Sequence, residues 1–261
     1  MTIVLIAALL YLAAAGLLVR SVAGGISGAR GWLPVAVGAI ALHFVVHLLA
    51  WRAVGGADLH FFAALSLVGL GMAALTTLYG AGGRMAALGV IVFPLATALL
   101  LGYATQGGGR VEGLDWRLQL HAWCALLAYA TLAVAALLAI LLWAQERALR
   151  RRELHRWLRA LPPLTELESL LFRTIAVGFA LLTATLLTGV LFVEDLLAQH
   201  LIHKTVLSAL SWLAFGALLM GRWRRGWRGA TAVRWTLAAM ALLLLAFFGS
   251  KFVLELLLDR V

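Results

Sequence analysis

The sequence predicts an all-α fold, a polytopic membrane helix bundle of about eight transmembrane helices. Of its 261 residues, 64% are hydrophobic and only 12% are charged, whereas about a quarter of the residues in soluble proteins are charged. The apolar residues fall in blocks of about twenty, the length that crosses a hydrocarbon core of roughly 30 Å. These blocks lack the alternating polarity of a β-barrel, so they must be helices that satisfy their own backbone hydrogen bonds.

Eight apolar blocks, separated by charged residues, glycine or proline, define the predicted spans. They cover residues 2–19, 33–51, 60–80, 86–103, 118–143, 171–193, 203–221 and 232–254. The first block has neither the basic start nor the cleavage site of a signal peptide, so we expect it to be retained. The outer connections are too short to form a soluble domain. Residues 1–261 are therefore predicted to form a single integral membrane domain.

The arginines predict the orientation, because basic residues in short connections stay on the cytoplasmic side. Residues 147–159 and 222–234 are rich in arginine. With both segments inside, 15 of the 21 Lys and Arg residues lie inside and 6 lie outside. Both termini are then outside, in a multi-pass protein of the bacterial cytoplasmic (inner) membrane. The net charge of +10 reflects this bias and contact with membrane lipid, and no nucleic-acid partner is expected.

The longest inner connection, residues 145–161, is predicted to extend the fifth helix and then to lie along the membrane surface. Its apolar face consists of Leu154, Trp157, Leu158 and Leu161. Pro162 and Pro163 end this segment. Thr165 and Glu168 have the spacing of a capping box, which predicts that the sixth helix begins there.

The histidines are the strongest functional signal, because six of the seven are expected on the outer side of the membrane. These six are His43, His47, His60, His121, His200 and His203. Only His155 is expected to be cytoplasmic. An imidazole near a helix end can simply lie at the level of the lipid headgroups, and this structural role is favoured for His60, His155 and His200.

His43 is different, because it lies deep in the second span. A polar ring at that depth is costly unless it meets a partner, a ligand or a water-filled cavity, so a functional role is favoured. His47 lies on the same helix face, one turn nearer the outer surface. His121 and His203 open the fifth and seventh helices from the same side. For these two, a structural role and a binding role have equal weight from the residues alone.

Haem is a better candidate ligand for these histidines than zinc. Zinc sites need three or four protein ligands, whereas haem needs one or two axial imidazoles and an apolar slot. The lone Cys124 excludes an internal disulfide and a site that attaches haem covalently to this chain. The expected cofactor is therefore a non-covalent, b-type haem. The sequence has no phosphate-binding loop, nucleophile triad or metalloprotease motif, so these residues do not indicate an enzyme class.

Three segments resemble the cytochrome c assembly family of haem-handling membrane proteins. They are the runs from His121 to Leu132, from Leu161 to Leu164, and from His203 to Trp212. Two shorter motifs, at residues 226–229 and 247–251, are most similar to the eight-helix YpjD-like and HemX-like branch. The resemblance covers nearly the whole chain and is strongest over residues 118–254.

This resemblance implies roles for the outer and buried histidines. His121 and His203 match the family's outer axial ligands of haem iron. His43, with His47 beside it, matches a histidine within the membrane that is linked to haem passage. However, members that deliver haem carry a tryptophan-rich outer segment before the second ligand, and residues 194–202 of this chain lack it.

Two functions of different classes follow from the residues and the resemblance. The first is haem binding or transfer for cytochrome c assembly, with other assembly proteins or apocytochrome as partners. The second is a membrane regulatory or assembly partner without a stable cofactor, similar to the HemX-like members associated with control of haem synthesis. A transporter of another small solute ranks third, because no span shows the breaks at mid-membrane that transporters use.

Overall fold

The structure is a computed structural model that describes residues 1–24, 30–54, 58–82, 84–106, 115–152, 162–192 and 199–249. These residues form helices α1 (Thr2–Ala23), α2 (Trp32–Val54), α3 (Phe61–Ala81), η1 (Arg84–Leu88), α4 (Gly89–Gln106), α5 (Trp116–Arg150), α7 (Leu164–Phe192), α8 (Gln199–Arg225), α9 (Gly229–Leu244) and η2 (Leu245–Gly249). Within these ranges, eight helices are long and apolar enough to cross a membrane, and no strand is present. The predicted all-α membrane bundle is confirmed.

Large apolar side chains on the outside of the helices indicate that the fold is surrounded by lipid. Leu9, Leu78, Val190 and Leu191 are between 66% and 71% exposed. In water, each would leave apolar surface hydrated at a cost of about 25 cal/mol per Å². In a bilayer this surface is covered by lipid, and the helices need no polar outer face.

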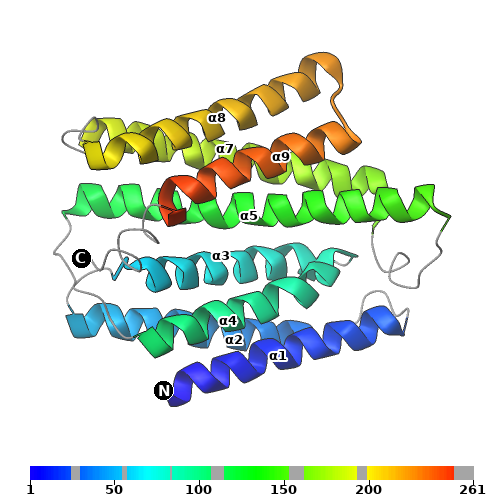
Figure 1. The fold of residues 1–261 in the computed structure, drawn as a ribbon. Coiled ribbons are helices and arrows are strands. Elements are labelled where there is room, and N and C mark those ends of the chain that lie inside the picture. The colour runs from blue at the N-terminus through cyan, green and yellow to red at the C-terminus, as the bar shows by residue number, and fades with distance from the viewer. Residues whose placement is uncertain are drawn as a thin grey trace. The chain divides into compact units, whose positions relative to one another are not determined.

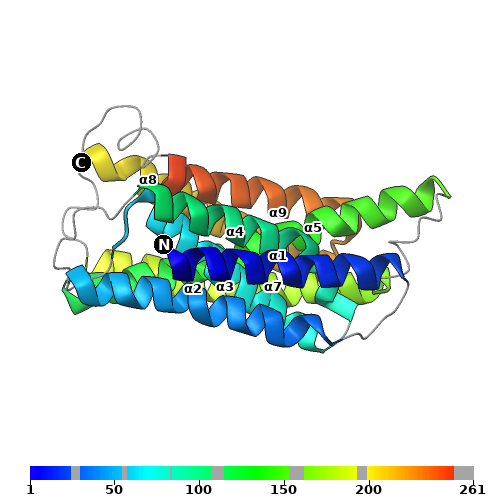
Figure 2. The same ribbon diagram turned by 90° about the horizontal axis from the view of Figure 1, so that it is seen from below.

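The chain divides into two compact units. Unit 1 contains α1 to α4 together with the end of α5 and the start of α7. Here α1 packs against α2 and α4, and α3 packs against the same two helices, so the four form a closed ring. Figure 1 shows α1 to α4 side by side, and Figure 2 shows α1 lying between α2 and α4. Residues that point to the middle of this ring are shielded from lipid.

Unit 2 contains the rest of α5 and α7, with α8, α9 and η2. Helix α8 packs against both α9 and η2. Figure 1 shows that the beginnings of α5 and α8 lie at the same end of this unit. That end carries His121 and His203 in the sequence.

The ends of two helices test the sequence predictions. Helix α5 continues to Arg150, which confirms that the fifth helix extends beyond its membrane span. Leu154, Trp157, Leu158 and Leu161 lie outside the described residues. The predicted start of the sixth helix is confirmed to within a residue, but Thr165 is not its N-cap. Helix α7 already begins at Leu164, so Thr165 is inside its first turn, and the carboxylate of Glu168 pairs instead with arginine side chains.

Candidate functional site

His43 lies at the centre of unit 1, on the face of α2 that points into the ring of helices. Its side chain is fully buried. Nδ1 lies 3.2 Å from the hydroxyl of Tyr11 on α1, and Nε2 lies 2.9 Å from the hydroxyl of Ser66 on α3. Both ring nitrogens therefore have a protein partner, which offsets the cost of placing an imidazole among apolar helices.

His47 lies one turn further along α2 and meets the same serine. Its Nε2 is 3.0 Å from Ser66 Oγ. Its ring is stacked on His43, with centroids 5.5 Å apart, and on Tyr103 of α4, with centroids 4.7 Å apart. The predicted histidine pair on one helix face is thus a contact in the structure. Ser66 and Tyr103 join it to two further helices.

His60 lies at one end of this cluster, beside the start of α3. It is the residue before the first turn of α3, and its Nδ1 pairs with the carboxylate of Asp58. The His60 ring is stacked on Tyr103 with centroids 5.7 Å apart. Its Nε2 is buried and has no hydrogen-bond partner among the residues that the structure describes. In the neutral ring, a proton on Nδ1 faces the carboxylate, which leaves the lone pair on Nε2.

His121 lies in the second turn of α5, in unit 2. Its Nδ1 is 3.2 Å from Oγ1 of Thr188 on α7. The hydroxyl of Thr188 already donates to the carbonyl groups of Ala184 and Thr185, at 2.8 and 3.0 Å. A hydroxyl has a single hydrogen, so when Thr188 donates it to one of these carbonyl groups, it accepts from His121 and Nδ1 carries the proton. Nε2 is left as the nitrogen with a free lone pair.

Gly189 of α7 lies directly against the His121 ring. A β-carbon at this position would lie 3.2 Å from Cε1 of His121, closer than nearly all real contacts. Only glycine therefore lets α7 approach the imidazole this closely without moving it. Thr188 and Gly189 together set the position of the His121 ring.

About one helical turn before His121 on α5, Trp116 and Arg117 form a cluster with Phe192 of α7. Trp116 of α5 and Phe192 of α7 have ring centroids 6.0 Å apart. The guanidinium of Arg117 lies 5.7 and 5.9 Å from these two centroids. Such contacts hold a cation near the membrane surface at little cost. Arg117 is one helical turn before His121 and so lies on the same face of α5.

The other predicted histidines are only partly described. His203 belongs to the second turn of α8 and His200 to its first, but their side chains lie outside the described residues, as does the whole of His155. Among the described residues, no group of three or more His, Cys, Asp and Glu side chains gathers as a metal-binding set. A zinc centre of the usual composition is therefore not found in the described part of the chain.

Comparison with known proteins identifies the family. The family described as "Cytochrome C assembly protein" matches residues 33–258. The chain belongs to this family. It is 31% identical to the inner membrane protein YpjD of Escherichia coli strain K12 over 239 residues, which are 87% of this chain and 89% of YpjD.

Two more distant relatives carry functional names. The cytochrome c biogenesis protein CcsA of Prochlorococcus marinus strain MIT 9515 is 32% identical over 89 residues, 33% of this chain and 28% of CcsA. The protein HemX of Brevibacillus brevis is 26% identical over 131 residues, 49% of this chain and 48% of HemX. No solved structure matches the chain.

One family-like motif, residues 226–229, forms the turn between α8 and α9. Gly226 and Gly229 have φ angles of 64° and 51°, in the left-handed region that glycine adopts without strain. The ring of Trp227 fills the space beside Gly221, where a β-carbon would lie only 2.4 Å from it. The motif therefore specifies a tight turn closed by an aromatic side chain.

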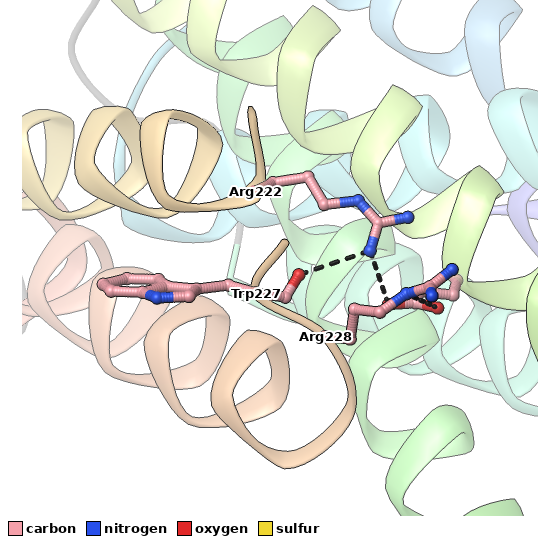
Figure 3. Close-up of polar contacts among 4 residues, drawn as sticks. Arg222, Trp227 and Arg228 are labelled. Atoms are coloured by element: carbon pink, nitrogen blue, oxygen red, sulfur yellow. Dashed lines mark hydrogen bonds and ion pairs between the residues drawn. The ribbon is translucent and has the colours of Figure 1, made fainter. Parts of the chain in front are cut away.

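A buried carboxylate anchors this turn to α7 (Figure 3). Glu168 accepts from Arg222 at 3.0 Å and pairs with Arg228 at 3.4 Å. Arg222 also donates to the carbonyl of Trp227 at 3.3 Å and lies 4.7 Å from the ring centroid of Phe172. Three helices are thus joined at the end of unit 2 opposite the start of α5. The motif has a structural role here.

The second family-like motif begins in the π-helical turn η2. Tyr129 of α5 donates to the carbonyl of Leu243 at 2.6 Å, just before this turn. The Tyr129 ring lies 5.9 and 5.3 Å from the rings of Phe247 and Phe248. A π-turn shifts the backbone hydrogen bonds of a helix by one residue. The aromatic contacts with α5 stabilise the chain at this point.

Sequence reasoning missed the hydroxyl partners of the histidines: Tyr11, Ser66 and Thr188. Their signal is weak, because hydroxyl side chains in membrane helices commonly bond to their own backbone. Thr174, Thr183 and Thr185 do so in α7. Nothing local in the sequence shows which hydroxyl instead reaches an imidazole on another helix.

Proposed function

We propose that this protein binds haem through His121 and His203 and takes part in haem handling or transfer for cytochrome c assembly, in the bacterial inner membrane. Membership of the cytochrome c assembly family supports the assignment. The similarity to a protein named for cytochrome c biogenesis supports it further. The ligand is a non-covalent haem, because iron can be held by axial imidazoles alone.

The observation that carries the proposal is the hydrogen bond between His121 and Thr188. An axial histidine must present a nitrogen without a proton to iron, and its other nitrogen usually donates to a hydroxyl, carbonyl or carboxylate that fixes the ring. Thr188 provides this acceptor at 3.2 Å from Nδ1. With Nδ1 directed to Thr188, Nε2 is the nitrogen that would bind iron.

The second ligand is assigned to His203 by its place in the chain. It lies near the start of α8, and the starts of α8 and α5 lie at the same end of unit 2 (Figure 1). Arg117 is suited to a carboxylate of the porphyrin, because it carries its charge on the His121 face of α5. His43 and His47 remain predicted cofactor-contacting residues. In the structure, iron at His43 would have to displace Tyr11 or Ser66.

The test is an absorption spectrum of the purified full-length protein after haem is supplied. We expect the wild type to show an axially ligated haem, His121→Ala and His203→Ala each to change the ligation, and the double variant to retain little haem. His155→Ala, on the cytoplasmic connection, serves as the control. A double variant that equals the wild type in spectrum and occupancy would exclude the pair as ligands.

The alternative function is a membrane regulatory or assembly partner with no stable cofactor. It is favoured by the lack of a tryptophan-rich segment in residues 194–202 and by the similarity to HemX over about half of the chain. A wild-type protein that takes up no haem in the same experiment would support this alternative.

A further inference from the structure

Ser66 bridges two imidazoles in the interior of unit 1. Its hydroxyl lies 2.9 Å from Nε2 of His43 and 3.0 Å from Nε2 of His47. The serine is fully buried, as is His43. Two histidines and a hydroxyl in one contact are unusual among apolar helices, where each polar side chain costs free energy.

The number of hydrogens determines how this bridge is built. Ser66 has one hydroxyl hydrogen, so it donates to one ring and accepts from the other. Tyr11 is fully buried, and His43 Nδ1 is the partner that the structure shows for its hydroxyl. Tyr11 therefore donates to Nδ1, His43 donates from Nε2 to Ser66, and Ser66 donates to His47. All the donors point from the centre of the ring towards His47.

We propose that Ser66 relays protons between His43 and His47. When His43 carries a proton on both nitrogens, its Nε2–H bond breaks and the proton passes to Ser66 Oγ. The original O–H bond of the serine breaks at the same time, and that proton forms a new N–H bond at Nε2 of His47, which carries no proton in this arrangement. His43 keeps its proton on Nδ1, where the hydroxyl of Tyr11 accepts it, and the reverse step returns one proton from His47 to His43. The ligand of this site is a proton, so the inference is independent of haem.

Further titratable side chains lie between His47 and the expected outer surface. On α4, Tyr103 contacts the rings of both His47 and His60. At the start of α3, Asp58 pairs with His60, whose Nε2 is buried and has no hydrogen-bond partner in the structure. Titratable groups thus continue from His47 towards the expected outer surface.

On the inner side, the chain of hydrogen bonds ends at Tyr11. The ring of Tyr11 packs against Phe93, with centroids 5.9 Å apart. No further polar partner of Tyr11 occurs among the described residues. The relay is therefore open towards the outer surface and closed by aromatic packing within the membrane, which suits delivery of protons to and from His43 rather than conduction across the bilayer.

Hydrogen–deuterium exchange of the ring N–H of His43 tests the relay. The full-length protein, labelled with ¹⁵N-histidine and placed in lipid nanodiscs, would be transferred to deuterated buffer and followed by NMR. Ser66→Ala should slow the exchange by an order of magnitude or more, because the proton loses its route to His47. A serine with only a structural role predicts the opposite, because loss of its hydrogen bond exposes the N–H.

Two further variants make the result specific. Thr76→Val removes a buried hydroxyl of the same helix that has no hydrogen-bond partner in the structure, so exchange at His43 should stay as in the wild type. His47→Phe keeps a ring against Tyr103 but removes the proton acceptor, so it should slow exchange as Ser66→Ala does. Exchange that is unchanged or faster in Ser66→Ala overturns the relay. If Ser66→Ala does not fold, the relay is overturned when the exchange rate of the His43 N–H in His47→Phe equals that of the wild type.

Discussion

In the proposed haem site, Thr188 orients His121 although it would not touch iron itself. With its hydroxyl as the acceptor of the Nδ1 proton, Nε2 is the nitrogen that faces a ligand. Thr188→Val keeps the shape of the side chain and removes this acceptor. We expect haem affinity to fall by about 10- to 100-fold, the usual effect of losing a group that orients a metal ligand. A haem titration followed by absorbance measures it.

Thr185→Val is the matched control for this substitution. It removes a hydroxyl from the same helix that donates to the carbonyl of Leu181, 2.9 Å away. Its haem affinity should stay close to that of the wild type. Equal losses in the two variants would mean that the affinity depends on the packing of α7 and not on the orientation of His121.

His43 should matter more for the stability of the protein than His47. His43→Leu leaves the buried hydroxyl of Tyr11 without the partner it has in the structure, and such a loss costs about 1–3 kcal/mol. His47 is only half-buried, so His47→Leu removes less. Unfolding of both variants in mixed detergent micelles gives the comparison. A larger loss in His47→Leu would contradict this ranking.

At the scale of the elements, Glu168 joins α7 to the turn between α8 and α9. Glu168→Gln leaves the partly buried Arg222 without its counter-charge. We expect the free energy of unfolding to fall by about 1–3 kcal/mol, the cost of an unsatisfied partner. Glu166→Gln, which changes an exposed carboxylate two residues earlier, should have little effect. Equal stability of the two variants would show that the ion pairs contribute nothing.

The beginning of α7 also shows where local sequence signals fail. Thr165 and Glu168 have capping-box spacing, yet the helix already includes Thr165. A capping box is worth only about 1 kcal/mol, so a tertiary contact can outweigh it. Here Glu168 is turned to two arginines from distant parts of the sequence. The π-turn η2, next to the Tyr129 contact, has no comparable local signal.

For the whole molecule, the orientation in the membrane remains a prediction from the distribution of arginine. Single cysteines would be introduced in a Cys124→Ser background and treated on intact cells with a thiol reagent that does not cross membranes. A cysteine near Glu112 should react, and one near Arg150 should not, because basic connections stay in the cytoplasm. The reverse pattern would place both termini inside.

The sequence by itself determined the eight spans and the family. Lipid as solvent sets the length and hydropathy of a crossing helix regardless of its neighbours. Only the tertiary structure decided the partners of His43 and His121. The hydroxyls of Tyr11, Ser66 and Thr188 lie 32, 23 and 67 residues from the imidazoles that they meet. Each contact depends on which helix faces pack together, because a hydroxyl without a neighbouring helix bonds to its own backbone.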